Sequence, residues 1–311
     1  MTVLEFINDI IQYDFVRKGL FASIMVGVIC GVLGCFIVLR GLALMGDAVS
    51  HAIVPGVAIS FILSINIFYG AVAAGTLAAL GIGYVKQNSR IKLDSSIGIV
   101  FTAFLALGVL LIRHAKSGLK LDNLMFGSLT SVQSSDMWLT LGIGTVVLLT
   151  LLLFYKELVV STFDPIMAAA YGLPTGLIHY ALMVLLTLVT VASMQTVGVI
   201  LVVSLLIMPA STAYLLTNRL SIMMLLSATF GVISTLVGLY YSFSYDLQSG
   251  AVIVLAAFTL FVLVFFLAPG RGVLWLAVGK LMRSSQTRAS QTRPSTQHAA
   301  AKLINHGDQS P

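Results

Sequence analysis

Charged side chains are scarce in this sequence. Asp, Glu, Lys and Arg make up 9% of the 311 residues, whereas 59% of the residues are hydrophobic. A soluble globular domain carries about a quarter charged residues, so this chain cannot present an ordinary aqueous surface. The mean hydropathy of +1.04 agrees with this. We therefore expect a polytopic integral membrane protein, because a lipid bilayer is the solvent that suits such a surface.

Sequence patterns for enzymatic chemistry are missing as well. The chain has no G-x-x-x-x-G-K-[ST] loop, no H-E-x-x-H motif and no G-x-S-x-G motif. The segment MGDA lacks the first Gly of the G-x-G-D pattern of intramembrane aspartyl proteases. These absences predict that the chain is not an enzyme and does not bind ATP through a P-loop.

Cysteine is equally rare. Cys30 and Cys35 lie five residues apart on one predicted helix, which is too far and wrongly angled for a disulfide. We expect both to be apolar filling.

The formal net charge is +6, but the basic residues do not form an interleaved basic face. Their distribution therefore indicates membrane topology and not nucleic-acid binding.

Long hydrophobic runs are what the sequence does contain. Only α-helices satisfy their backbone hydrogen bonds in runs of this length, because barrel strands would alternate and be shorter. We predict an all-α fold with about eight or nine transmembrane helices. The early acidic residues Glu5, Asp9 and Asp14 argue against a cleaved signal peptide. The expected spans cover residues 18–39, 46–64, 67–85, 96–112, 137–155, 177–193, 196–216, 222–243 and 250–268.

The distribution of Lys and Arg predicts the orientation. With nine spans, twelve of the 17 basic residues lie on the side of the C-terminus and five on the other side. Basic residues are enriched in cytoplasmic loops, so we place the C-terminus in the cytoplasm. Residues 1–14 then form an external interfacial segment, and residues 15–270 form the membrane domain. The basic end and polar tail, 271–311, should be cytoplasmic, and the tail should be disordered.

One polar break between spans is long and reads KELVVSTFDPIMAAAYGLPTG, residues 156–176. Asp164 followed by Pro165 is typical of a helix start, and Gly172 is typical of a helix end. We predict a short cytoplasmic helix at about 163–173. Such a helix can pass motion from a soluble motor protein into the membrane. The alternative is an interfacial turn without a function.

A carboxylate and an imidazole lie within the second span, GLALMGDAVSHAIVPGVAISF. Asp47 and His51 are four residues apart, so they share one helix face. Ionisable groups inside a membrane point to function, and this pair suits Mn²⁺, Fe²⁺ or Zn²⁺ but not Cu(I). Two ligands are too few for a divalent ion, but a homodimer with this helix at its axis would supply two Asp and two His. The alternative is an Asp–His hydrogen bond with a structural role.

Two further polar residues are weaker candidates for the metal site. Asp246 lies in an external loop, where it could receive a cation or be a solvated turn residue, and Gln195 lies in the external break MQTVG.

Small residues recur in GVICGVLG, where Gly27 and Gly31 are four apart and Gly34 follows. This spacing lets helices pack closely, either within the chain or across a dimer.

Three segments together resemble the bacterial manganese/zinc ABC-importer permeases, the membrane subunits of metal-ion ABC transporters. The opening signature of that family is similar to GCFIVLRGLALMGDAVSHAIVPGVAISF. Its cytoplasmic coupling helix is similar to STFDPIMAAAYG, and its late-span signature to MQTVGVILVVSLLIMPASTAYL. The resemblance runs from Phe15 to Gly270. The pattern G-D-A-x-S-H-A-x-x-P-G is highly specific within a membrane span.

The resemblance implies a fold, a site and a set of partners. The fold would be that of a type II ABC-importer permease in a bacterial plasma membrane. Asp47 and His51 would coordinate the transported metal, and the segment with Asp164, Ala168 and Gly172 would dock on a cytoplasmic ATP-binding-cassette ATPase dimer. A homodimeric permease, an extracellular metal-binding receptor protein and no permanently bound cofactor are also implied. MQTVGVILV looks more like the manganese members, which favours Mn²⁺ over Zn²⁺ or Fe²⁺ as the cargo.

Two other transporter classes are alternatives. A secondary, ion-driven transporter would need no ATPase, but such proteins usually contain inverted repeats, and the halves of this chain show no convincing repeat. A siderophore or cobalamin permease would share the ATP-driven mechanism but would need a wide path without an Asp–His pair. The segment GDAVSHA argues against it.

Overall fold

The structure is a computed structural model that describes residue 5 and residues 12–114 and 133–268. These ranges contain helices and no strands. The chain divides into two units, Met1–Leu263 and Val264–Pro311, and only the first five residues of the second unit are described. The predicted tail and most of the predicted external segment lie outside the described residues.

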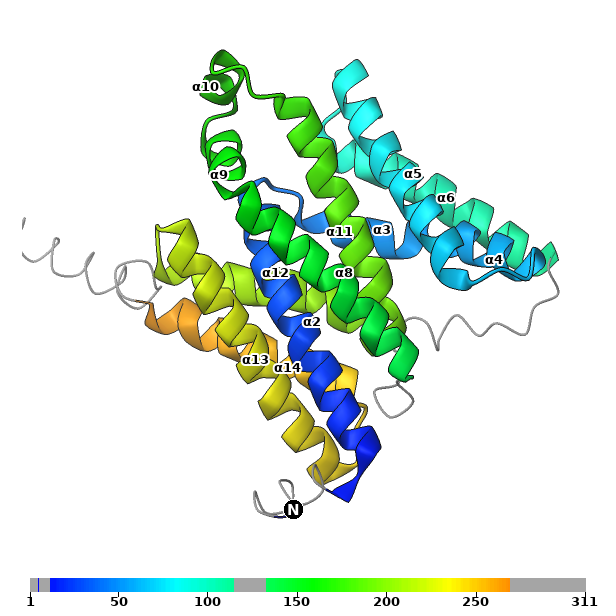
Figure 1. Cartoon of the computed structure of the whole chain (residues 1–311), viewed down its shortest axis with the longest axis vertical. Coiled ribbons are helices and arrows are strands. Elements are labelled where there is room, and N and C mark those ends of the chain that lie inside the picture. Colours follow the sequence, from blue (N-terminus) through cyan, green and yellow to red (C-terminus); the bar gives the residue numbers. More distant parts are fainter. Residues whose placement is uncertain (1–4, 6–11, 115–132, 269–311) are drawn as a thin grey trace, which may run out of the picture. The chain divides into compact units, whose positions relative to one another are not determined.

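The helices follow one another along the chain as labelled in Figure 1. They are α2 (Asp14–Leu39), α3 (Ala43–Ala52), α4 (Val54–Ile62), α5 (Ile67–Asn88), α6 (Leu93–His114), α8 (Ser134–Leu153), α9 (Tyr155–Phe163), α10 (Pro165–Ala170), α11 (Thr175–Val197), α12 (Val199–Leu216), α13 (Leu220–Tyr245) and α14 (Ser249–Leu267).

The predicted spans agree with these helices. In the described ranges, nine segments are long and apolar enough to cross a membrane, and each overlaps one predicted span. The second span is interrupted, because α3 and α4 together make up its length, Ala43–Ile62. The short helices α9 and α10 lie between the spans α8 and α11. The all-α membrane fold is therefore confirmed.

Helix α2 is one of the most deeply buried spans. Within its most apolar stretch 72% of the residues are buried, against 17% for α6. It packs against α8, α11, α12 and α13, and Figure 1 shows it running beside α13. The exposed side chains of α6 and α8 therefore face lipid or another protein, whereas α2 faces its own chain.

Glycines explain how closely α2 approaches α13. A Cβ atom added to Gly31 would lie 2.9 Å from the Ser227 carbonyl oxygen, and one added to Gly27 would lie 3.2 Å from the Gly231 backbone. The Ser227 hydroxyl also donates a 2.7 Å hydrogen bond to the Gly31 carbonyl oxygen. The close packing predicted from GVICGVLG is thus made within the chain, a choice that the sequence left open.

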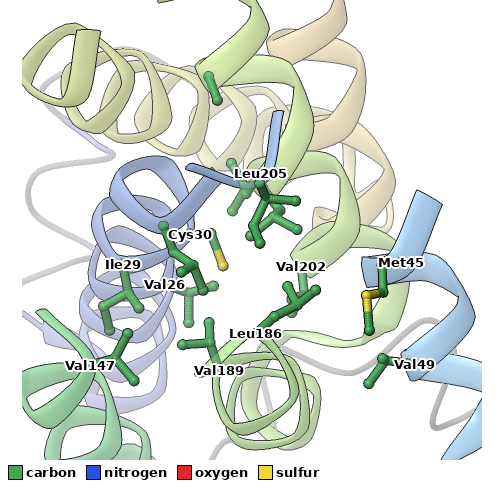
Figure 2. Packing of buried hydrophobic residues seen from close by; sticks show 14 of the residues in the cluster. Val26, Ile29, Cys30, Met45, Val49, Val147, Leu186, Val189, Val202 and Leu205 are labelled. Carbon is green, nitrogen blue, oxygen red and sulfur yellow. The ribbon is translucent and has the colours of Figure 1, made fainter. Parts of the chain in front are cut away.

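The apolar core brings together side chains of several spans. Figure 2 shows Val26 and Cys30 of α2 beside residues of α11 and α12, and Met45 of α3 belongs to the same core cluster. Cys30 and Cys35 are both free and buried, as predicted. Helix α3, which carries the predicted metal ligands Asp47 and His51, is therefore packed on one side against the apolar core.

A single residue, Gly198, joins α11 to α12. Its φ of 87° and ψ of 159° lie in a region that is essentially restricted to glycine. The chain therefore changes direction between two spans without a loop. Gln195 lies in the last turn of α11, directly before this junction.

Candidate metal-translocation site

The turn after α2 determines where α3 begins. Gly41 has a φ of 67°, and its N–H donates a 3.1 Å hydrogen bond to the Val38 carbonyl. The Leu42 N–H donates a 2.9 Å hydrogen bond to the Ile37 carbonyl. This pair of bonds is a Schellman cap, which ends α2 and lets α3 begin at Ala43. The start of α3 is therefore fixed to the end of α2 by a short, hydrogen-bonded turn.

Both predicted metal ligands lie on α3. Asp47 Oδ1 and His51 Nε2 are 3.7 Å apart. This distance is too long for a hydrogen bond, so the structural alternative, an Asp–His hydrogen bond, is not formed in this structure. Two donor atoms bound to one transition-metal ion at about 2.1 Å each lie about 3.0 to 3.4 Å apart. A small closure of the pair would therefore let both side chains bind one ion.

The two side chains differ in their surroundings. The Asp47 side chain is 58% exposed and the His51 side chain is 24% exposed. The His51 ring packs edge-on against Phe101 of α6, with 5.6 Å between the ring centroids. Phe101 thus limits the rotation of the imidazole, while the Asp47 carboxylate stays open to an ion or to a second protein.

The second span breaks two residues after His51. Ile53 separates α3 from α4, and Pro55 lies in the first turn of α4. Because Pro55 has no N–H, the His51 carbonyl cannot accept the helical hydrogen bond that would come from four residues ahead. The carbonyl end of a helix also carries partial negative charge, which favours a cation near His51. The sequence analysis did not name Pro55 or Phe101 as neighbours of the candidate site, although a proline four residues after a candidate ligand was a readable sign.

Of the two weaker candidates, Asp246 does not form a cluster with this pair among the described residues. Asp246 ends α13 in the left-handed conformation, with a φ of 51°, which aspartate tolerates better than most residues. Gln195 lies beside the α11–α12 junction. In the described ranges no group of three or more His, Cys, Asp or Glu side chains could hold a metal. One copy of the described chain therefore offers Asp47 and His51 without a third ligand of these types.

The predicted cytoplasmic helix corresponds to α10. Its bounds, Pro165–Ala170, lie inside the expected range of 163–173. The Asp164 side chain caps its first turn by accepting a 2.8 Å hydrogen bond from the Met167 N–H. Gly172, with a φ of 80°, adopts the left-handed conformation that ends it. Both ends of this short helix are thus fixed by the residue types that predicted it.

The side chains around α10 divide by exposure. Ala168 is buried against its own chain, whereas Ile166 is 83% exposed, Tyr171 73% and Met167 50%. Large apolar side chains exposed outside the spans are typical of a contact with another protein. The sequence-based site named the residues that shape this helix and missed the three that can touch a partner. Their apolar character in a polar break was the available sign.

Comparison with known proteins places the chain in a family. The ABC 3 transport family matches residues 12–268, which include α3 and α10. The chain belongs to the ABC 3 transport family. The resemblance drawn from the three sequence motifs is therefore confirmed over nearly the whole described chain.

Individual members of the ABC 3 transport family are similar along their length. The manganese transport system membrane protein MntC of Halalkalibacterium halodurans is 56% identical over 270 residues, covering 86% of this chain and 92% of that protein. The manganese import system permease protein ScaB of Streptococcus parasanguinis is 49% identical over 267 residues, covering 86% and 95%. The solved structure of PsaBC from Streptococcus pneumoniae in complex with Fab matches with a TM-score of 0.80 and 47% identity, covering 89% of this chain and 100% of that chain.

These matches, together with the nine candidate spans of the described chain, identify the class of membrane protein. The chain is a multi-pass permease of a bacterial plasma membrane, with the fold of type II ABC-importer-like permeases. The secondary-transporter alternative loses support because the matching family is an ABC transport family. The siderophore-permease alternative loses support because the similar proteins named above carry manganese-transport names.

Proposed function

We propose that this chain is the permease subunit of an ATP-driven importer of divalent transition-metal ions, with Mn²⁺ as its cargo. The observation that carries the proposal is the Asp47–His51 pair, 3.7 Å apart on an interrupted membrane helix. Carboxylate and imidazole ligands also suit Fe²⁺ and Zn²⁺. The choice of Mn²⁺ is supported by the names of the relatives and by the segment MQTVGVILV.

A second copy of the chain would complete the metal site. A divalent transition metal takes at least four ligands, and one copy provides the Asp47–His51 pair. A two-fold axis beside the exposed Asp47 side chain would bring two carboxylates and two imidazoles together, with water filling the remaining positions. A small separation of the two α3 helices would then break this site and release the ion.

Energy for import would come from a separate protein. The chain has no P-loop, so ATP would be hydrolysed on a cytoplasmic ATP-binding-cassette ATPase dimer. The exposed side chains of Ile166, Met167 and Tyr171 would fit a groove on that ATPase. A metal-binding receptor protein would deliver the ion from the external side. No permanently bound cofactor takes part.

The proposal is tested with the complete transporter in proteoliposomes. The permease, its ATPase and its receptor are reconstituted, and uptake of radioactive manganese is measured with and without ATP. We expect uptake to require ATP, the permease and the ATPase, and to be lost in Asp47→Ala. Uptake that persists without the ATPase would support the secondary-transporter alternative instead.

The identity of the cargo needs a separate measurement. Uptake of radioactive Mn²⁺, Zn²⁺ and Fe²⁺ is measured separately over the same range of concentrations. We expect Mn²⁺ to be transported at the lowest concentration of the three. Faster zinc uptake at equal concentration would keep the permease function and change the metal.

A further inference from the structure

An arginine connects the base of α10 with the start of the metal-ligand helix. Arg40 donates from Nε to Thr162 Oγ1 at 3.0 Å and from Nη2 to Ser161 Oγ at 2.9 Å. Ser161 and Thr162 form part of the last turn of α9, just before Asp164, which caps α10. Arg40 itself is the C-cap of α2, three residues before α3. One guanidinium therefore bridges segments more than 100 residues apart in sequence.

The acceptors are oriented by their own helix. The Thr162 hydroxyl donates a 2.6 Å hydrogen bond to the Leu158 carbonyl, so its lone pairs are left to accept from Arg40. Ser161 is buried and Arg40 is half-buried, which limits competition from water. Hydrogen bonds from a charged donor are about twice as strong as neutral ones. The contact is therefore built to hold its geometry.

Two helix ends supply the negative field at this guanidinium. α2 ends at Leu39 and α9 ends at Phe163, and the carbonyl end of each helix is partially negative. In the described ranges no carboxylate lies within 4.0 Å of Arg40. Burial lowers the pKa of Arg40 from its usual value, yet arginine remains protonated in proteins. The helix ends and the two hydroxyls thus stabilise the guanidinium charge, and a movement of α9 would displace the Arg40 side chain.

We propose that Arg40 is a positioning residue that transmits movement of α9 and α10 to α3, and so couples ATP hydrolysis to metal release. The inference rests on the proposed function. The path is short at every step: a capped helix, two hydroxyls, one guanidinium and the Schellman turn at Gly41. Asp47 then lies in the second turn of α3. Such a chain of rigid, hydrogen-bonded elements can carry a displacement between two sites.

The test measures manganese transported per ATP hydrolysed by the complete reconstituted complex. In Arg40→Ala this ratio should fall about tenfold or more, within the usual range of coupling between sites. Manganese binding to the permease and binding of the ATPase should stay at wild-type levels. Arg40→Lys keeps the charge but not the fork of donors, so it should restore part of the ratio.

A second set of variants removes the acceptors and leaves Arg40 in place. Ser161→Ala combined with Thr162→Val should lower the ratio as much as Arg40→Ala does, and adding Arg40→Ala should cause no further loss. Thr145→Val is the matched control, because its hydroxyl makes only a 2.7 Å bond to its own helix at Leu141 and is not near this contact. If Arg40→Ala does not assemble, the acceptor variants decide alone.

The outcomes separate this inference from the proposed function. A wild-type complex that shows no ATP-dependent manganese uptake overturns both. Wild-type uptake together with an unchanged transport-to-ATP ratio in Arg40→Ala, or in the acceptor variants, overturns the inference alone. Fully additive losses would also reject it, because they would mean that arginine and hydroxyls act separately.

Discussion

His51 is the residue whose chemistry can be tested most sharply. Asparagine in its place keeps a polar group that hydrogen-bonds but is a poor transition-metal ligand. We expect His51→Asn to lower the rate of manganese uptake by about tenfold or more, as is common when a residue that supports a metal site is replaced. Uptake is measured in proteoliposomes, and insertion and assembly are checked by size-exclusion chromatography.

Asp246 provides the matched control for His51. Asparagine adopts the left-handed conformation found at this position, so Asp246→Asn changes the charge without straining the turn. Uptake by this variant should be close to normal, because Asp246 is not grouped with the Asp47–His51 pair in the described part of one copy. Strong transport by His51→Asn would instead mean that the pair has a structural role.

Gly31 tests the packing between α2 and α13. In Gly31→Ala the new Cβ would lie 2.9 Å from the Ser227 carbonyl oxygen, so the two helices must move apart. Overpacking of this kind costs about 1–3 kcal/mol, and the thermal unfolding midpoint in detergent should fall. In Gly142→Ala the added Cβ has no atom within 4 Å, so the midpoint should not fall. Equal midpoints for both variants would contradict the described contact.

The stability of the short helix α10 depends on the residue that ends it. Gly172 has a φ of 80°, and a β-branched residue there costs about 1–2 kcal/mol. Gly172→Val should therefore loosen the end of α10 and weaken binding of the ATPase, measured as the affinity of the purified proteins. Gly172→Asn is the control, since asparagine tolerates this conformation, and it should bind nearly as tightly as wild type. Equal weakening by both would point to side-chain size and not backbone strain.

Some of these elements could be predicted from the sequence and others could not. The nine spans were predictable because each is a long apolar run between polar breaks. The cap residues Asp164 and Gly172 likewise carry a local pattern. The break at Ile53 was not predicted, although Pro55, two residues later, is a residue type that often interrupts a helix. The contact of Arg40 with Ser161 joins residues 121 positions apart, and no local pattern contains that information.

The contact of Arg40 with α9 also bears on the membrane topology of the chain. Because Arg40 touches α9, the end of the first span and the segment after the fifth span lie on one side of the membrane, as alternating spans require. We propose that this side is the cytoplasm, with residues 15–270 forming the permease domain, 1–14 outside and 271–311 inside. Twelve of the 17 basic residues then lie inside.

The orientation can be checked by labelling single cysteines on intact cells. Gln248→Cys and Ala170→Cys are introduced separately into a Cys30→Ser/Cys35→Ser background, since both positions are exposed. An impermeant thiol reagent should label position 248 and leave position 170 unlabelled. Permeabilised cells serve as the control, in which both positions should react. Labelling of position 170 from outside would overturn the orientation and the coupling built on it.

The interruption of the second span has an electrical consequence. Ten residues of α3 precede Ile53 and nine residues of α4 follow it, so His51 lies near the middle of the second predicted span. A doubly charged ion that arrives there from outside has crossed about half of the membrane voltage, worth about 2.3 kcal/mol at 100 mV, inside negative. That energy corresponds to about a fiftyfold gain in the apparent affinity for an ion that enters from outside. In the proposed importer the voltage would thus favour filling of this site before any ATP is used, and collapsing the voltage should raise the external manganese concentration needed for half-maximal uptake.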